Sequence, residues 1–320
     1  MNAPVAAAAQ SGLPRLAASI TDAQVRSYIE QGYLVVPGLV QPDEIEALKR
    51  DTVALARGAY PCATLKPVPD GLSDREVIES ILCLHQPHYV SPVMAAFARH
   101  AAICATLSRI IAAHLPFWDG RVKCMQSMLF VKPPGFPGQA WHQDELYIPT
   151  RDRSLAGAWI AIDDATIDNG CLWVIPGSHR TGYLYPQREH GKLDEFDFAG
   201  ESHGFDESAE VPVEVKAGTV VIFNGYLLHR SRRNRSQGFR RALVNHYMNA
   251  WSLLPWEGGA GAMDTRTIVP VVGEDPYAWK GVVTPTDGVW LRPRASAAQT
   301  ADATPVAAAG TVDAGRAVIA

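Results

Sequence analysis

The order of helix-like and strand-like segments is the feature that most constrains the fold of this chain. Before Pro116 the apolar residues recur at helical spacing, and after it short β-prone runs are separated by turn residues. Helices followed by many short strands favour an α+β protein, because strands without helices between them pair as antiparallel sheets. We therefore expect a β-sandwich or jelly-roll core with the N-terminal helices packed on it.

Signals at the helix ends place the predicted helices. Thr21 and Gln24 form a capping box, in which each side chain binds the other residue's backbone N–H, and Gly32 ends this first helix. A second helix is predicted to begin at Pro42, because the N–H that proline lacks has no partner in a first turn. A third is predicted from about residue 91 to residue 114.

The predicted strands are short and lie mostly after the helices. Asn169-Gly170 lies between two apolar runs and predicts a hairpin, because both residues tolerate a positive φ. The strands are expected at residues 33–36, 121–131, 156–163, 171–175, 211–215, 219–223 and 241–251.

The chain is long enough for one large domain. Its 320 residues can bury a substantial core without disulfides or metals, and no linker interrupts residues 21–294, where we expect a single domain. Residues 1–20 are predicted to be a flexible leader. The alanine-rich residues 295–320 are predicted to be a disordered tail.

Composition argues against several classes of protein. The formal charge of −4 does not favour a nucleic-acid-binding protein. No apolar run reaches the roughly 18–20 residues of a membrane span, and residues 1–20 lack the features of a signal peptide. The five cysteines include no CxxC pair, so we expect neither a disulfide framework nor a thiolate zinc site, and a reducing, cytoplasmic location. A small molecule is the expected partner, and no oligomeric state is predicted.

The segment Trp141-His142-Gln143-Asp144 carries the strongest chemical signal. Residues i and i+2 of an extended segment point to the same face, so His142 and Asp144 can converge on one ion. His229, which follows a β-prone run, is the best candidate for a third ligand. Two histidines and one carboxylate leave three octahedral positions open, as in non-haem Fe(II) oxygenases. Two of these positions can chelate an oxo acid, and the third can receive O₂.

Arg240 favours the oxygenase interpretation. A buried arginine on the next strand can donate two N–H bonds to the distal carboxylate of an oxo acid, and Ser231 can donate a further one. Two alternatives stay open. The triad of a metal-assisted hydrolase would hold Zn²⁺ and activate water, but a hydrolase has no need of such an arginine. A non-catalytic ligand-binding protein has no need of a complete ligand set.

Several motifs follow one another in order and spacing. They are Gly-Tyr-Leu-Val-Val-Pro-Gly at 32–38, Met-Leu-Phe-Val-Lys-Pro-Pro at 128–134, His-Gln-Asp at 142–144, Asn-Gly-Cys-Leu-Trp-Val-Ile-Pro-Gly-Ser-His at 169–179, and the segment from His229 to Arg240. In these motifs the chain resembles the phytanoyl-CoA dioxygenase family of Fe(II)- and 2-oxoglutarate-dependent oxygenases, over roughly residues 21–251. The fold that this resemblance implies is a double-stranded β-helix, a cupin-like jelly roll, in agreement with the order of helices and strands.

The resemblance also implies a site and a reaction. The implied iron ligands are His142, Asp144 and His229, and the implied contacts of the distal carboxylate of 2-oxoglutarate are Arg240 and Ser231. Met128, Gln143 and Trp159 fall where family members contact the cosubstrate or line its pocket. The implied reaction uses Fe(II), 2-oxoglutarate and O₂, and releases succinate and CO₂. Related halogenases have a small residue in place of the acidic ligand, so the presence of Asp144 favours hydroxylation of a small-molecule substrate, either a bacterial metabolite or an acyl-type compound.

Other polar features receive structural interpretations. His246 is treated as a structural or surface histidine, and Glu145 is expected to point away from the metal. The arginine-rich run at 230–235 is either an anion site near the pocket mouth or a solvated loop. Residues 182–210 are expected to form a long flexible insertion that can close over the site.

Overall fold

The computed structural model describes residues 20–293, except residues 62–70, 80, 255–267 and 283–289. The predicted tail at 295–320 lies outside the described residues, as does the predicted leader except for Ile20. Among the described residues, no helix is both long and apolar enough to cross a bilayer. The helices are α1 (Asp22–Gln31), α2 (Pro42–Ala56), α3 (Asp74–Glu79), α4 (Pro92–Ala98) and α5 (Ala101–Ile110).

The strands form two main antiparallel sheets. The larger sheet has the order β1-β10-β5-β12-β3-β2-β14, with β13 also paired to β3. Its strands are β1 (Tyr33–Val36), β2 (Ile81–His85), β3 (Val122–Phe130), β5 (Ala156–Ala161), β10 (Val220–Asn224), β12 (Ala242–Asn249), β13 (Val269–Val272) and β14 (Trp290–Pro293). The smaller sheet has the order β4-β11-β6-β9, with β4 (Gln139–His142), β6 (Leu172–Val174), β9 (Val211–Val213) and β11 (His229–Ser231). The short strands β7 (Gln187–Arg188) and β8 (Glu201–Ser202) pair with each other.

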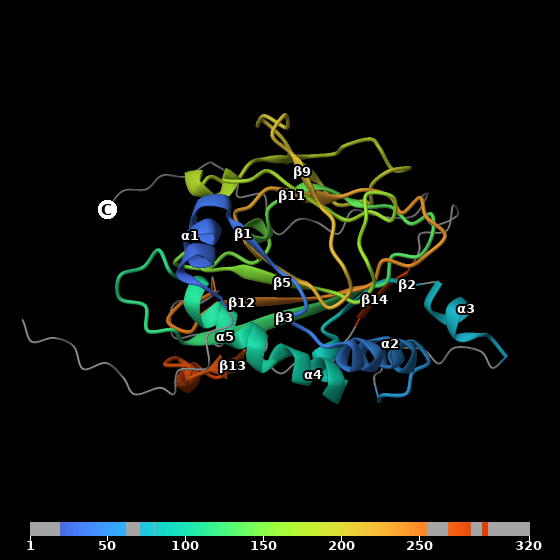
Figure 1. Cartoon of the computed structure of the whole chain (residues 1–320), viewed down its shortest axis with the longest axis horizontal. Helices are drawn as coiled ribbons and strands as arrows, with labels where there is room; N and C mark the ends of the chain where they lie inside the picture. The colour runs from blue at the N-terminus through green and yellow to red at the C-terminus, as the bar shows by residue number, and fades with distance from the viewer. Residues whose placement is uncertain (1–19, 62–70, 80, 255–267, 283–289, 294–320) are drawn as a thin grey trace, which may run out of the picture.

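The larger sheet is the middle layer of the molecule. Figure 1 shows α2, α4 and α5 along one side of it, and β9 and β11 of the smaller sheet on the other. Successive residues of a strand point to opposite faces, so neighbouring positions join different cores. Leu243 and Ile160 belong to the core on the helical side, whereas Val244 and Trp159 pack with Val174 of the smaller sheet. Helices on one side of two facing antiparallel sheets confirm the predicted α+β jelly-roll fold.

The predicted helices are present, with one difference. The Thr21–Gln24 capping box forms, and Gly32 ends α1 with a φ of 82°. The segment predicted as one helix from residue 91 to residue 114 is two helices, because the chain breaks at Arg99 and restarts at His100. The His100 side chain accepts the backbone N–H of Ile103 and so caps α5.

The predicted Asn169-Gly170 hairpin is wrong. The turn is real, since Gly170 has a φ of 81°, but β5 before it and β6 after it belong to different sheets. The Asn169 side chain accepts the N–H of Thr166 and donates to the carbonyl of Asp164, which stabilises a longer connection between the sheets. A turn signal in the sequence does not say which strands it joins.

Candidate metal centre

The structure brings the three predicted ligands together at one end of the smaller sheet. His142 ends β4, Asp144 begins a 3₁₀ turn (Asp144–Leu146), and His229 begins β11 directly opposite His142. The Nε2 atoms of His142 and His229 lie 3.6 and 3.7 Å from the same Asp144 oxygen, Oδ1. The three ligand atoms lie within 4.8 Å of one another, a spacing that one ion can bridge.

Backbone carbonyls set the tautomers of both histidines. His142 Nδ1 lies 2.8 Å from the carbonyl oxygen of Ala140, and His229 Nδ1 lies 3.0 Å from that of Leu227. A carbonyl can only accept, so each Nδ1 carries the proton and each Nε2 presents its lone pair to the centre. Burial lowers the pKa of His229 to about 4, so this imidazole is neutral near pH 7, as metal binding requires.

His246, which was expected to be a structural or surface histidine, contacts the second oxygen of Asp144. Its Nε2 lies 2.9 Å from Asp144 Oδ2, and its Nδ1 faces the side-chain nitrogen of Gln126 at 3.5 Å. The bond to His246 leaves Oδ1 directed at the two ligand histidines. The sequence does indicate that His246 lies on the same face as Arg240. The two positions differ by an even number, and alternate residues of a β-strand share a face.

Arg240 is a buried cation without an acidic partner. Its side chain is 3% exposed, and its Cζ lies 5.5 Å from the ring centroid of Trp159. Among the described residues, its guanidinium has no ion pair and no side-chain hydrogen bond, and its buried Nε has no partner. Burial lowers the pKa of Arg240 to about 10, which still leaves it charged near pH 7. A buried charge is costly unless a counter-charge meets it, so the position is suited to an anion.

Met128 and Trp159 lie in one row across the larger sheet. Val244 of β12 pairs with Met128 on one side and with Trp159 on the other, so the three side chains share a face. This face packs toward the smaller sheet, on which His229 lies. Both residues therefore face the space between the sheets, and their contact with a cosubstrate stays a prediction.

Gln143 ties the metal-binding turn to its surroundings. Its side-chain amide donates to the carbonyls of Tyr183 and Tyr226, at 3.0 and 2.8 Å, and accepts the N–H of Tyr185. These bonds use both amide hydrogens, so the predicted contact of Gln143 with a cosubstrate would fall to its carbon atoms or backbone. Glu145 is bound by the Thr150 hydroxyl, away from the triad.

Arg230, the first residue of the arginine-rich run, lies on the opposite face of the smaller sheet from the triad. Arg230 follows His229 in β11 and so points the other way, with its Cζ 4.4 Å from the ring centroid of Trp141. Its guanidinium pairs with Glu207 and Glu210, and Arg235 pairs with Glu195. After β11 the run continues as a loop in which Arg235 is exposed, as the solvated-loop alternative predicts. Its arginines also bind acidic residues of the segment 182–210.

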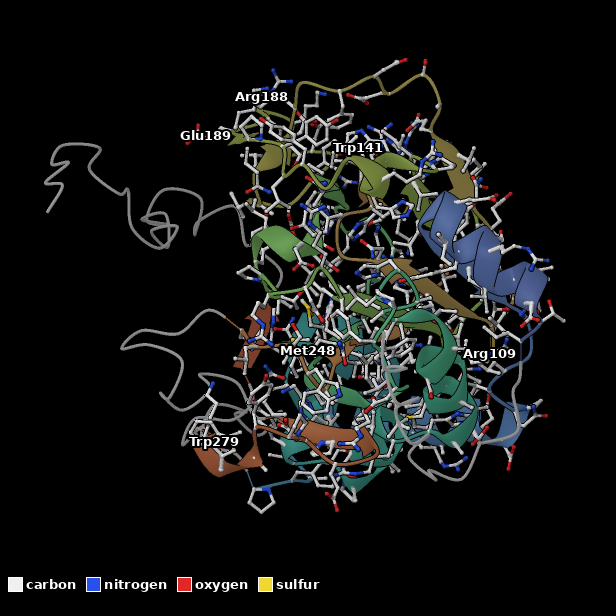
Figure 2. All side chains as sticks on the ribbon, turned by 90° about the vertical axis from the view of Figure 1, so that its left-hand side faces the viewer. Arg109, Trp141, Arg188, Glu189, Met248 and Trp279 are labelled. Carbon is white, nitrogen blue, oxygen red and sulfur yellow. The ribbon has the colours of Figure 1, made fainter. Side chains whose placement is uncertain are left out.

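The segment 182–210 is attached at several points. Gln143 holds its beginning, and Glu207 near its end accepts the indole N–H of Trp141 at 2.8 Å. Figure 2 shows Trp141 at the same end of the molecule as Arg188 and Glu189 of this segment, which lie at the outer edge of the molecule. The segment is therefore bound to the smaller sheet and borders the metal centre.

Two histidines and an aspartate at one end of a double-stranded β-helix form the ligand set that non-haem Fe(II) oxygenases use. The family model of phytanoyl-CoA dioxygenase (PhyH) matches residues 28–242. The chain belongs to this family, whose members include 2-oxoglutarate-dependent non-haem iron oxygenases.

Known proteins similar to the chain agree with this assignment. It is 30% identical over 276 residues to phytanoyl-CoA dioxygenase 1 of Oryza sativa subsp. japonica. The aligned region covers 75% of the chain and 94% of that protein. It is 29% identical to phytanoyl-CoA dioxygenase domain-containing protein 1 of Danio rerio, over 74% of the chain and 94% of that protein.

Solved structures support the fold. EctD from S. alaskensis with bound Fe is 24% identical, with a TM-score of 0.57 over 75% of this chain and 80% of its own. The epimerase SnoN in complex with Fe³⁺, alpha ketoglutarate and nogalamycin RO is 19% identical, with a TM-score of 0.56 over 84% of this chain and 97% of its own.

Proposed function

We propose that this dioxygenase uses Fe(II) and 2-oxoglutarate to hydroxylate a small-molecule substrate, with release of succinate and CO₂. In this proposal His142, Asp144 and His229 hold the iron, and Arg240 with Ser231 binds the distal carboxylate of 2-oxoglutarate. Met128 and Trp159 line the cosubstrate pocket from the larger sheet. The family assignment supports the class of reaction, and the geometry of the described residues supports these roles.

The observation that carries the proposal is the buried Arg240 guanidinium without an acidic partner. Hydrolysis at a metal needs no second anion-binding group, so this feature favours an oxygenase over a metal-assisted hydrolase. A planar guanidinium matches a carboxylate in geometry as well as in charge. A dicarboxylic oxo acid would neutralise Arg240 with one end while its other end reaches the triad.

The residues of the chain orient the reactants and protect the site from water. When bound, Fe(II) together with 2-oxoglutarate and O₂ supplies the oxidising power. The carbonyls of Ala140 and Leu227 hold the Nδ1 sides of the ligand imidazoles, so that both Nε2 atoms are directed inward, and His246 orients Asp144. Phe223 packs against His229 with ring centroids 4.7 Å apart and shields this ligand on the side of the larger sheet.

We propose hydroxylation as the reaction because Asp144 is present and its carboxylate is directed at both histidines. The solved relatives widen the range of reactions to test. One is described as the epimerase SnoN and another as the carbocyclase SnoK. The substrate in this proposal is a polar metabolite or an acyl-type compound.

Consumption of 2-oxoglutarate tests the proposal. Purified protein is loaded with Fe(II) without oxygen, mixed with 2-oxoglutarate and a metabolite extract, and exposed to O₂. We expect formation of succinate and CO₂, and a product that has gained one oxygen atom. His142→Ala, Asp144→Ala and His229→Ala serve as controls and should abolish succinate formation. Wild-type protein that binds Fe(II) but neither binds nor consumes 2-oxoglutarate would refute the proposal.

A further inference from the structure

Lys132 is a buried lysine beside the proposed cosubstrate site. It follows β3 in the Met128–Pro134 motif, and only 1% of the residue is exposed. Its Nζ lies 3.1 Å from Ser231 Oγ and 3.4 Å from the carbonyl oxygen of Gly170, and it also contacts the carbonyl oxygen of Arg232. A lysine ammonium has three hydrogens, and these three oxygens can accept all of them.

The contact with Lys132 determines the direction in which the Ser231 hydroxyl can donate a hydrogen bond. Ser231 Oγ accepts from the Lys132 ammonium and from the backbone N–H of Gln139, at 3.3 Å. Among the described residues, the Ser231 hydroxyl donates no hydrogen bond. With both lone pairs engaged, its proton remains free for an external acceptor, and Ser231 lies on the same side of β11 as His229.

In its ammonium form, which the three oxygen acceptors favour, Lys132 adds a second buried positive charge. Among the described residues, no carboxylate pairs with Lys132, and its acceptors are neutral oxygens. Burial lowers the pKa of Lys132 well below its usual value, and the nearby positive charge of Arg240 lowers it further. An anion placed between these groups would relieve that repulsion.

The backbone of the neighbouring turn leaves room for the ammonium. A β-carbon on Gly170 would lie 2.7 Å from Lys132 Nζ and 2.3 Å from the carbonyl oxygen of Arg232. The peptide carbonyls of two separate segments, at Gly170 and Arg232, thus converge on one lysine head group. A close fit of this kind fixes the ammonium beneath Ser231.

We propose that Lys132 is a positioning residue for the cosubstrate: it directs the Ser231 hydroxyl at the distal carboxylate and adds positive charge to that pocket. The selectivity for an oxo acid with a second carboxylate then depends on Lys132. This inference rests on the proposed function, since it concerns the same cosubstrate.

Binding of two oxo acids, one with and one without a distal carboxylate, distinguishes this positioning role of Lys132 from a general structural role. The affinities of Fe(II)-loaded protein for 2-oxoglutarate and for 2-oxopentanoate, which lacks the distal carboxylate, are measured by calorimetry without oxygen. We expect Lys132→Met to weaken binding of 2-oxoglutarate roughly tenfold and to leave that of 2-oxopentanoate unchanged. Lys123→Met is the matched control, because Lys123 is equally buried on β3 but pairs with Asp275.

A double-mutant cycle shows whether Lys132 acts through Ser231. In a Ser231→Ala background, Lys132→Met should weaken 2-oxoglutarate binding by clearly less than in the wild type. Lys132→Gln, which keeps two N–H donors and loses the charge, replaces Lys132→Met if the latter does not fold. Unchanged 2-oxoglutarate affinity in either variant, or equal losses for both acids, would overturn the role of Lys132. Wild-type protein that does not prefer 2-oxoglutarate would instead overturn the proposed function.

Discussion

His246 limits how far the Asp144 carboxylate can rotate, since it binds the oxygen that the ligand histidines do not face. We expect His246→Phe to weaken Fe(II) binding roughly 10- to 100-fold, the usual effect of losing a hydrogen-bond partner of a metal ligand. An anaerobic Fe(II) titration measures this effect. His246→Gln, which keeps an N–H donor, should lose less, and equal losses in the two variants would contradict an orienting role.

Arg240 has a role that can be separated from iron binding. Arg240→Ala should raise the KM for 2-oxoglutarate roughly tenfold or more, because a charge-assisted, two-pronged contact is lost. The affinity for Fe(II) should stay unchanged, since Arg240 contacts none of the three ligands in the described structure. Arg240→Lys keeps the charge without the planar fork and should fall between wild type and alanine. Unchanged cosubstrate kinetics in the alanine variant would refute the assignment.

The attachment of segment 182–210 to the smaller sheet depends on Arg230. Its side chain is 10% exposed, pairs with Glu207 and Glu210, and packs on Trp141. We expect Arg230→Met to lower the free energy of unfolding by about 2 kcal/mol, as for the loss of hydrogen bonds to a charged group. Limited proteolysis should then cleave segment 182–210 sooner.

Arg235 provides the matched comparison for this element. It pairs with Glu195 of the same segment, but its side chain is 60% exposed. Because water screens exposed ion pairs, Arg235→Met should cost less than about 1 kcal/mol and leave the proteolysis pattern unchanged. If denaturant unfolding shows that Arg230→Met and Arg235→Met lower the free energy of unfolding equally, the attachment of segment 182–210 does not depend on the burial of the arginine.

At the scale of the whole molecule, local patterns predicted the elements better than their pairing. The apolar runs that form β3, β5, β10 and β12 were identified, because buried strands leave a strong signal. The strands β4 and β11, which carry the metal ligands, are short and partly polar, so the sequence alone marked them by their histidines. The order of strands depends on contacts between distant segments, which no local pattern records. The spacing of residues 240 and 246 indicates a shared face, but the contact of His246 with Asp144 follows only from the order of the strands.

Global stability should depend on pH through His88, which lies where the strands of the larger sheet meet the helical layer. It is 8% exposed, and its Nδ1 bonds to the hydroxyl of Ser127 on β3. Burial lowers the pKa of His88 to about 4, and the positive charge of Arg99 lowers it further. Between about pH 4 and 6.5 the unfolded chain therefore binds more protons at this position than the folded protein does.

This difference makes the native state less stable as the pH falls through that window. The difference between a pKa of 6.5 and one of about 4 corresponds to at most about 3.4 kcal/mol of native-state stability. This contribution is present in full above pH 6.5 and is lost progressively down to pH 4. We expect denaturant unfolding of the His88→Gln variant to depend less on pH than that of the wild type. The variant-minus-wild-type difference cancels the titration of the metal ligands, which both proteins share. His114→Gln, at an exposed histidine, is the control. Parallel curves for wild type and His88→Gln between pH 4 and 6.5 would show that His88 does not couple folding to proton binding.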